Sequence, residues 1–292
     1  YGNTALGYQT LMANVAGSQN TAIGYNALKL NNGQENAAYG SEALVSNLDG
    51  SYNTAIGSRA LKGNTTGISN TAVGNLAMVS NKANSFNTAV GYAAMKYTDD
   101  RTEGSSTFNT AIGALALHGS FTISENTGQF NTAVGGQALY SASSGTGNIA
   151  IGHQAAYNLT TGNANVVLGN GALYYSNSQS YAVAVGDSAL YNNGDGASGD
   201  DAMYNVAVGY KALYGNHVGF KNTAMGHFAL YSNNQGNDNT ALGSYALYSN
   251  STGNGNIAIG SEAGYSNQTG SGNIAIGRAA LSNSSDNSGI VA

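Results

Sequence analysis

One glycine that recurs along the whole chain limits the fold more than any other feature of the sequence. It follows the core Asn-Thr-Ala-(Ile/Val/Leu), precedes x-x-Ala-Leu, and stands at positions 7, 24, 40, 57, 74, 91, 113, 135, 152, 169, 186, 209, 226, 243, 260 and 277. Eleven of the fifteen intervals are 17 residues long, one is 16, and the others are 22 or 23. A fixed period of this kind is the signature of a repeat protein, so we predict one repeat domain that spans residues 1–292 without a linker.

The asparagine and the glycine of each copy have structural explanations. The asparagine is present in fifteen of the sixteen copies, with Ala182 as the exception, and a repeated asparagine in stacked coils favours a tight turn or a hydrogen-bonded ladder. The glycine bends or ends a strand where a side chain would clash or where φ must be positive. We therefore assign structural roles to Asn20, Asn53, Gly24, Gly57, Gly152 and Gly277.

The residues between the asparagine and the glycine predict a short strand. The first is Thr, Val or Ile in nearly every copy, the second is Ala in all but one, and the third is usually aliphatic, so β-branched residues share one face and Ala the other. The Ala-Leu that follows the glycine predicts a second short strand, and a polar loop closes the coil. One such coil cannot bury its own apolar face, but a stack of coils can. We predict an all-β fold: a parallel β-solenoid, or β-roll, of sixteen mostly 17-residue repeats.

The alanine column also bears on assembly. Small residues on one strand face imply two sheets in close approach within one chain, which leaves the β-branched and Leu columns in need of another surface. We therefore expect the chain to partner itself as a homotrimer, in which three copies pack these columns together.

The core resembles the repeats of trimeric autotransporter adhesin heads, the YadA-like left-handed parallel β-roll. The hallmark of a small polar residue, an aliphatic, Ala, an aliphatic and Gly occurs here as Asn148–Gly152 and Asn273–Gly277. Similar repeats occur in phage tail-fibre proteins. The resemblance covers all sixteen copies and implies a homotrimer with an adhesive or fibre role. The copies here are longer than the usual head repeat, which implies longer loops.

Composition excludes several classes of protein. The net charge is −5 with only nine Lys and Arg, so we expect no nucleic-acid partner. No apolar run approaches 18 residues, so this segment should not insert into a membrane. The chain has no Cys, and it begins at Tyr1 rather than Met, so we expect a processed or partial chain. An extracellular location, on a cell surface, in a virion fibre or as a secreted filament, fits these features.

Catalytic residues are not evident. The four histidines, His118, His153, His217 and His227, lie at different repeat positions and in no ligand motif. The glycines follow the repeat period rather than a phosphate-loop pattern, and no nucleophile elbow is present. We predict that the protein is not an enzyme and needs no cofactor.

Three long intervals place insertions near residues 97–108, 118–130 and 191–204. The third is the most acidic, and Asp195, Asp200 and Asp201 are its candidate Ca²⁺ ligands, although the spacing is not that of an EF-hand. The alternatives are solvated bulges, or projecting loops that contact a host glycan or protein.

A tyrosine column marks the second half of the chain. The fifth residue after the glycine is tyrosine in eight successive copies: Tyr140, Tyr157, Tyr174, Tyr191, Tyr214, Tyr231, Tyr248 and Tyr265. The rings of such a column can stack on one another and so stiffen the repeat structure, or they can bind a glycan or a partner filament.

Together these features predict a structural extracellular fibre or adhesin subunit that mediates surface attachment through a rigid β-roll. The alternatives are the shaft of a phage tail fibre that recognises a host, and a self-polymerising filament subunit. A minor alternative is ice binding through the Thr column, which the change to Val and Ile in the second half disfavours.

Overall fold

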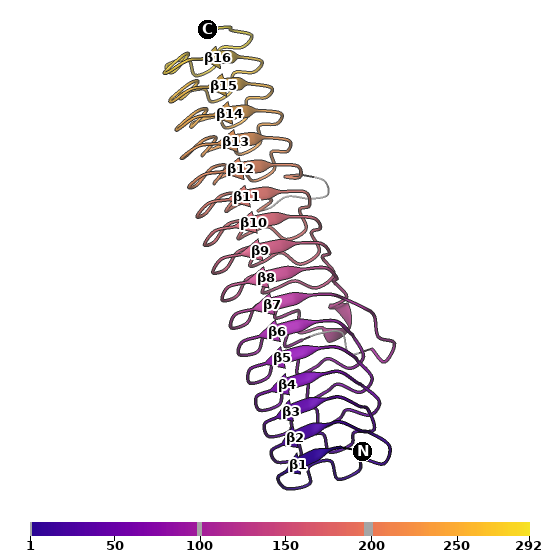
Figure 1. Cartoon of the computed structure of the whole chain (residues 1–292). Helices are drawn as coiled ribbons and strands as arrows, with labels where there is room; N and C mark the ends of the chain where they lie inside the picture. The colour runs from indigo at the N-terminus through magenta and orange to yellow at the C-terminus, as the bar shows by residue number, and fades with distance from the viewer. Residues whose placement is uncertain (1, 98–100, 196–200) are drawn as a thin grey trace. The chain divides into compact units, whose positions relative to one another are not determined.

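The computed structural model describes residues 2–97, 101–195 and 201–292 (Figure 1). The chain divides into two compact units, residues 1–147 and 148–292, and each is described by itself. The described residues form sixteen strands of three residues, one for each copy of the repeat, and a single-turn 3-10 helix, η1 (Ile123–Glu125). That part of the chain therefore offers no helix with the length and hydrophobicity to cross a bilayer.

The strands begin directly after the position of the repeated asparagine, which is Ala182 before β11. In the first unit they are β1 (Thr4–Leu6), β2 (Thr21–Ile23), β3 (Ala37–Tyr39), β4 (Thr54–Ile56), β5 (Thr71–Val73), β6 (Thr88–Val90), β7 (Thr110–Ile112) and β8 (Thr132–Val134). In the second unit they are β9 (Ile149–Ile151), β10 (Val166–Leu168), β11 (Val183–Val185), β12 (Val206–Val208), β13 (Thr223–Met225), β14 (Thr240–Leu242), β15 (Ile257–Ile259) and β16 (Ile274–Ile276).

Within each unit, consecutive strands pair in parallel and in chain order. Equivalent residues of the repeat face each other, as in the pairing of Ala55 with Ala72 between β4 and β5. The register keeps the middle residue of each strand, which is Ala except at Val167, on the inner face, and the first and third residues on the outer face. The predicted all-β parallel β-solenoid is therefore confirmed.

The Ala-Leu segment is not a second strand, so that prediction was wrong, as was the expectation of two sheets in close approach. The chain after each glycine forms turns, in which the Leu has left-handed φ, for example 48° at Leu28 and 49° at Leu61. Neighbouring coils still exchange backbone hydrogen bonds here: the Leu28 N–H donates to the Ala43 carbonyl at 3.0 Å. The turn tightens the coil enough to bring the Leu side chain under the strand.

The core lies inside each coil and combines three columns. The strand Ala, the Ala three residues after the glycine and the following Leu are all buried, as Ala22, Ala27 and Leu28 show. The expectation that the Leu column needs a second chain was therefore wrong, because its partners are the Ala columns of its own chain. The first and third residues of the strands, in contrast, stay exposed or half-exposed to solvent.

Two ladders of buried asparagine side chains join the coils, and one of them was predicted. In the predicted ladder, the Asn53 side-chain amide donates to the Gly67 carbonyl at 2.8 Å, and its Oδ1 accepts the Asn70 backbone N–H at 3.0 Å. In the second ladder, the Asn64 amide donates to Asn47 Oδ1 at 2.7 Å and to the same Gly67 carbonyl at 3.0 Å. The second ladder contains Asn14, Asn31, Asn47, Asn64 and Asn81, and in the other unit Asn193, Asn216, Asn233, Asn250 and Asn267. The ladders thus satisfy most of the polar groups that the coils bury; among the described residues the exceptions are the side-chain oxygens of Asn26 and Asn81.

The repeated glycine is required on two grounds. At Gly57, φ is 130°, and a Cβ atom would lie 2.6 Å from the backbone carbon and oxygen of Gly74 in the next coil. Gly24 and Gly152 have similar φ values and similar close contacts. Gly277 has φ of 126° but nothing within 4 Å of such a Cβ atom.

This difference allows the clash to be separated from the backbone strain. We expect Gly57→Ala to lower the free energy of unfolding by about 3–5 kcal/mol, because strain and a clash add. Gly277→Ala should cost about 1–3 kcal/mol, because it adds strain alone. Denaturant unfolding followed by circular dichroism measures both, and equal costs would show that coil-to-coil contact at the glycine is unimportant.

The asparagine ladder gives a second prediction. We expect Asn53→Ala to cost about 2–4 kcal/mol, because it leaves the buried Asn70 N–H without an acceptor and opens a small cavity. Asn75→Ala, at an exposed asparagine in the same unit, should change stability by less than about 0.5 kcal/mol. Denaturant unfolding of both variants tests the ladder, and a neutral Asn53→Ala would refute its importance.

Candidate functional site: an exposed strand face and a tyrosine column

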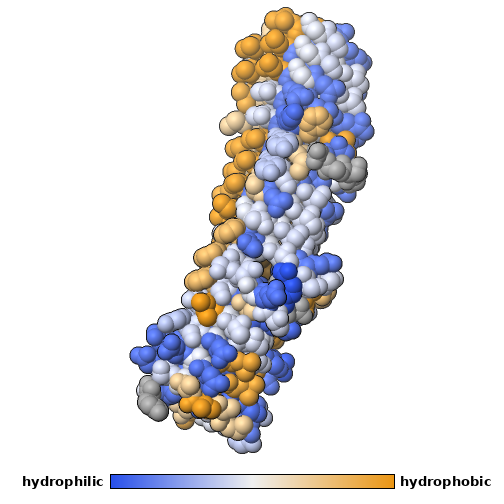
Figure 2. Space-filling view, turned by 90° about the vertical axis from the view of Figure 1, so that its right-hand side faces the viewer, coloured by the Kyte–Doolittle hydropathy of each residue, from blue (hydrophilic) through white to orange (hydrophobic). Residues whose placement is uncertain are grey.

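The outer side of the strands forms an exposed surface that we call the strand face. It consists of the first and third residues of every strand, and the middle residue is buried in β2 to β16. The third residues are the more exposed, for example 42% at Ile56 and 40% at Ile151. Figure 2 shows hydrophobic residues gathered in a stripe along the left edge of the upper part of the view. An aliphatic surface of this regularity is not explained by folding of a single chain.

The strand face differs in chemistry between the two units. In β1 to β8 its first column is Thr, with Ala37 as the exception, so hydroxyl groups alternate with aliphatic side chains. In β9 to β12 both columns are aliphatic: Ile149, Ile151, Val166, Leu168, Val183, Val185, Val206 and Val208. The second unit thus carries the more hydrophobic strand face.

An aromatic ladder that sequence analysis missed extends this surface in the first unit. Phe108 stacks on Phe86 with ring centroids 5.1 Å apart and on Phe130 at 5.8 Å, and the three are 41–54% exposed. Exposure alternates from Phe108 to Ile112, so the ladder lies on the outer side with the strand residues. In the second unit, Tyr181 and Tyr204 stack in the equivalent place at 5.1 Å. The signal in the sequence was an aromatic residue directly before the repeated asparagine.

The structure brings the predicted tyrosine column together as a stack. In the second unit, the rings from Tyr157 to Tyr265 follow one another at centroid distances of 5.1–5.2 Å, with interplanar angles of 3–14°. In the first unit, Tyr140 stacks on His118 at 4.7 Å. Burial and neighbouring tyrosines raise the pKa of Tyr191 and of Tyr248. Ring faces inside the stack are covered by other rings, so the column presents mainly ring edges and hydroxyl groups to solvent.

His118 holds the place of a tyrosine in this column. It is only 3% exposed, and its ring meets Tyr97 edge-on at 4.8 Å. Burial lowers the pKa of His118, and the positive charge of Lys96 adds to this effect, while the nearby Gly119 carbonyl opposes it. The folded state therefore binds a proton here less readily than the unfolded state does.

A pH dependence follows. Because the folded-state pKa is depressed, stability is complete above the unfolded-state value of 6.5 and is lost as the pH falls below it. We expect the unfolding temperature to drop between about pH 7.5 and pH 5, and His118→Tyr, which supplies the residue used in the later copies, to reduce that drop. His153→Tyr, at an exposed histidine, is the control. Equal pH dependence in wild type and His118→Tyr would contradict the assignment.

The acidic insertion does not show a metal site in its described part. Asp200 lies outside the described residues, Asp195 is exposed, and Asp201 lines a shallow surface hollow with Tyr204, Phe220 and Lys221. Across residues 2–97, 101–195 and 201–292, no three His, Asp or Glu side chains are grouped so that they could hold a metal ion. Calcium binding at this insertion stays a prediction.

The other histidines lie apart. The Nδ1 of His153 is 3.3 Å from Asn170 Oδ1, His217 Nδ1 is 3.3 Å from the Asp195 carbonyl, and His227 packs among aromatic rings. That the protein is not an enzyme also stays a prediction.

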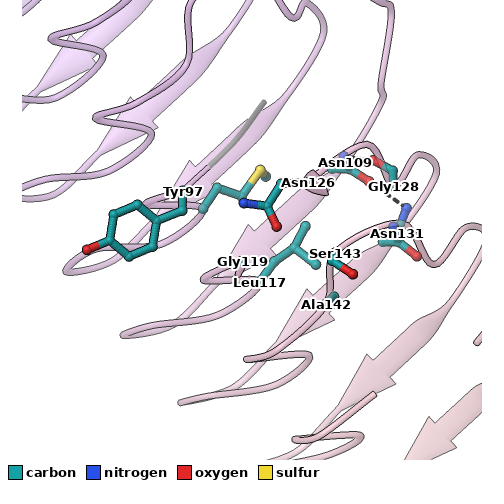
Figure 3. A pocket seen from close by; sticks show the side chains of 10 residues that line it. Tyr97, Asn109, Leu117, Gly119, Asn126, Gly128, Asn131, Ala142 and Ser143 are labelled. Carbon is teal, nitrogen blue, oxygen red and sulfur yellow. Dashed lines mark hydrogen bonds between the residues drawn. The ribbon is translucent and has the colours of Figure 1, made fainter. Parts of the chain in front are cut away.

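A small cavity in the first unit has a structural cause. Its volume is about 30 Å³, and its lining includes Tyr97, Asn109, Asn126, Gly128, Asn131 and Ala142 (Figure 3). Figure 3 shows Asn109, Gly128 and Asn131 grouped at one end, where the Asn109 amide donates to the Gly128 carbonyl at 2.9 Å. Ala142 stands at the repeat position that holds Asn64 and Asn81 in earlier coils of the second ladder, so an amide is missing from the column at this coil. The space suits about one water molecule rather than a substrate.

Comparison with known proteins does not identify a family. No protein-family model matches the chain, and no curated protein sequence matches it.

Proposed function

We propose that this protein is the subunit of an extracellular structural fibre or adhesin that assembles through its strand face, with three copies around a common axis. The observation that supports this most is the pair of uninterrupted aliphatic columns on β9 to β12, which stay exposed or half-exposed although the inner columns are already packed. The resemblance to adhesin-head repeats favours three copies.

Physical reasoning favours another copy of the chain as the occupant of this surface. Burying apolar area is worth about 25 cal/mol per Å², and a repeated flat face allows the same contact at every coil. Charged residues make up only 8% of the chain, and none lies on the outer columns of β9 to β12. An identical strand face meets these requirements, because Ile and Val columns can interdigitate as they do in packed sheets.

The same architecture suits a mechanical role. Coils are joined to their neighbours by strand pairing, by hydrogen bonds in the turns and by the predicted asparagine ladder, and in part of each unit by the second ladder as well. In such a stack every coil contacts its neighbours in the same way, so the resistance to deformation is spread along the whole repeat. A mechanical role of this kind requires no catalytic centre. Attachment would then use surface groups outside the shared face.

The mass in solution tests the assembly. We expect light scattering to give about 88 kDa, three times the chain mass of 29.5 kDa. The double variant Ile151→Lys and Val185→Lys should give a single-chain mass with an unchanged circular dichroism spectrum, because charge repels across the shared face. Gln235→Lys, at an exposed loop residue, should keep the wild-type mass.

The other outcomes are informative. A single-chain mass for wild type, or a trimer that survives both lysines, would refute assembly through the strand face. A much larger mass that grows with concentration would favour a self-polymerising filament. Thermal hysteresis in a freezing assay would instead support ice binding by the Thr column.

A further inference from the structure

The tyrosine column ends in the second unit, and its last ring has an uncovered face. Tyr265 stacks on Tyr248 at a centroid distance of 5.1 Å. In the following coil, the equivalent position is occupied by Ser282, whose side chain is too short to cover the ring. The other face of Tyr265 therefore borders open space, unlike the rings inside the column.

This open space is a surface hollow of about 470 Å³. It is lined by Tyr245, Glu262, Tyr265, Ser282 and Asn283. Its volume lies within the range of small-ligand sites. Two aromatic rings, a carboxylate, a hydroxyl and an amide thus surround one hollow.

The second ring of the hollow is held at an angle to the first. Tyr245 lies outside the tyrosine column and stacks on Phe228 at 5.4 Å. Its ring is tilted by 46° from that of Tyr265, with centroids 6.3 Å apart. The two rings therefore form two walls rather than a continuous stack, and packing against Phe228 and Tyr248 fixes both.

Glu262 supplies the charge of the hollow. The residue is exposed, and within the described part of the chain it forms no ion pair, whereas Glu42 binds both Lys62 and Arg59. A free carboxylate beside Tyr rings accepts hydrogen bonds from paired hydroxyl groups. It also repels phosphate and carboxylate ligands.

We propose that this hollow binds a neutral saccharide. One sugar ring lays its apolar C–H face on the uncovered face of Tyr265, Glu262 accepts hydrogen bonds from two neighbouring hydroxyl groups, and Asn283 and Ser282 bind at the rim. An entirely apolar ligand would leave Glu262 and Asn283 unpaired, and an anionic one would face Glu262. The site gives the proposed attachment function a ligand class and rests on that function for its role at a surface, but not for binding itself.

Saccharide titration tests the site. The probes are mannotriose, lactose, cellotriose and N,N′-diacetylchitobiose, with 3′-sialyllactose as the anionic comparison. Tyrosine fluorescence and saturation-transfer NMR should show saturable binding of at least one neutral probe with a Kd on the order of 1 mM. The sialylated probe should bind at least about tenfold more weakly. If no neutral probe saturates, the proposal is overturned.

Two variants assign binding to this hollow. Glu262→Gln should weaken binding about tenfold, and Ser282→Tyr should abolish it, because an added ring continues the column and covers Tyr265. Ser282→Tyr should not lower the unfolding temperature, which excludes misfolding as the cause. Ser249→Tyr, next to the column rather than in it, should bind as wild type. Undiminished binding in Ser282→Tyr would refute the site.

The same samples keep the two proposals apart. The Ile151→Lys and Val185→Lys variant should still bind the neutral probe if the hollow is a site within one chain. Glu262→Gln and Ser282→Tyr should keep the wild-type mass. If no saccharide binds but the mass is that of a trimer, the saccharide site is refuted and the assembly proposal stands. If a saccharide binds but the mass is not that of a trimer, the assembly proposal is refuted and the saccharide site stands.

Discussion

Hydrogen bonding between buried asparagine side chains is the interaction on which the rest of this structure depends. A carboxamide has two N–H donors and an oxygen that accepts two bonds, so one side chain can reach its own turn and both neighbouring coils. Asn53 shows this use, because it bonds to the Gly67 carbonyl, to Asn36 Oδ1 and to the Asn70 backbone. The chain has no disulfide and a core of mostly Ala and Leu, so these polar contacts fix how one coil sits on the next.

The conformation of each coil depends in turn on its neighbours. Tyr52, Arg59 and Leu61 all have left-handed φ between 49° and 61°, and such positions cost about 1–3 kcal/mol each for residues other than glycine. Their backbone groups are held by adjacent coils: the Arg59 N–H donates to the Ser41 carbonyl at 2.9 Å and the Leu61 N–H to the Ala77 carbonyl at 3.0 Å. An isolated coil would keep the backbone strain of these left-handed residues but would lack the hydrogen bonds to adjacent coils that offset it. The stack is therefore the smallest unit in which the turn is stable, as expected of a repeat protein.

The sequence predicted those parts of the fold that follow from a period of two. The alternation of residue types was enough to predict that Ala22 lies on the inner face and Ile23 on the outer face. The equivalence of the copies was enough to predict the parallel register. The turn at Leu28 was missed, because left-handed φ at Leu is imposed by packing between coils and has no local signal. Phe108 was missed because most copies lack an aromatic residue there. The hollow at Tyr245 and Glu262 could not be predicted, since it depends on which side chains of different coils lie together and on how the rings tilt.

The register between paired strands does not depend on the length of the loop that joins them. β6 and β7 lie 22 residues apart and β11 and β12 lie 23 apart, yet Thr88 faces Thr110 and Val183 faces Val206, as in the 17-residue copies. A single residue added between the asparagine and the glycine would instead turn Ala outward and a β-branched residue inward. Length can thus change in only two ways without disturbing the core: within a loop, or by a complete copy. Duplication or loss of a whole copy inside the stack leaves every surviving coil with the same kind of neighbour, so a gene of this type can vary in copy number while the encoded fold stays the same.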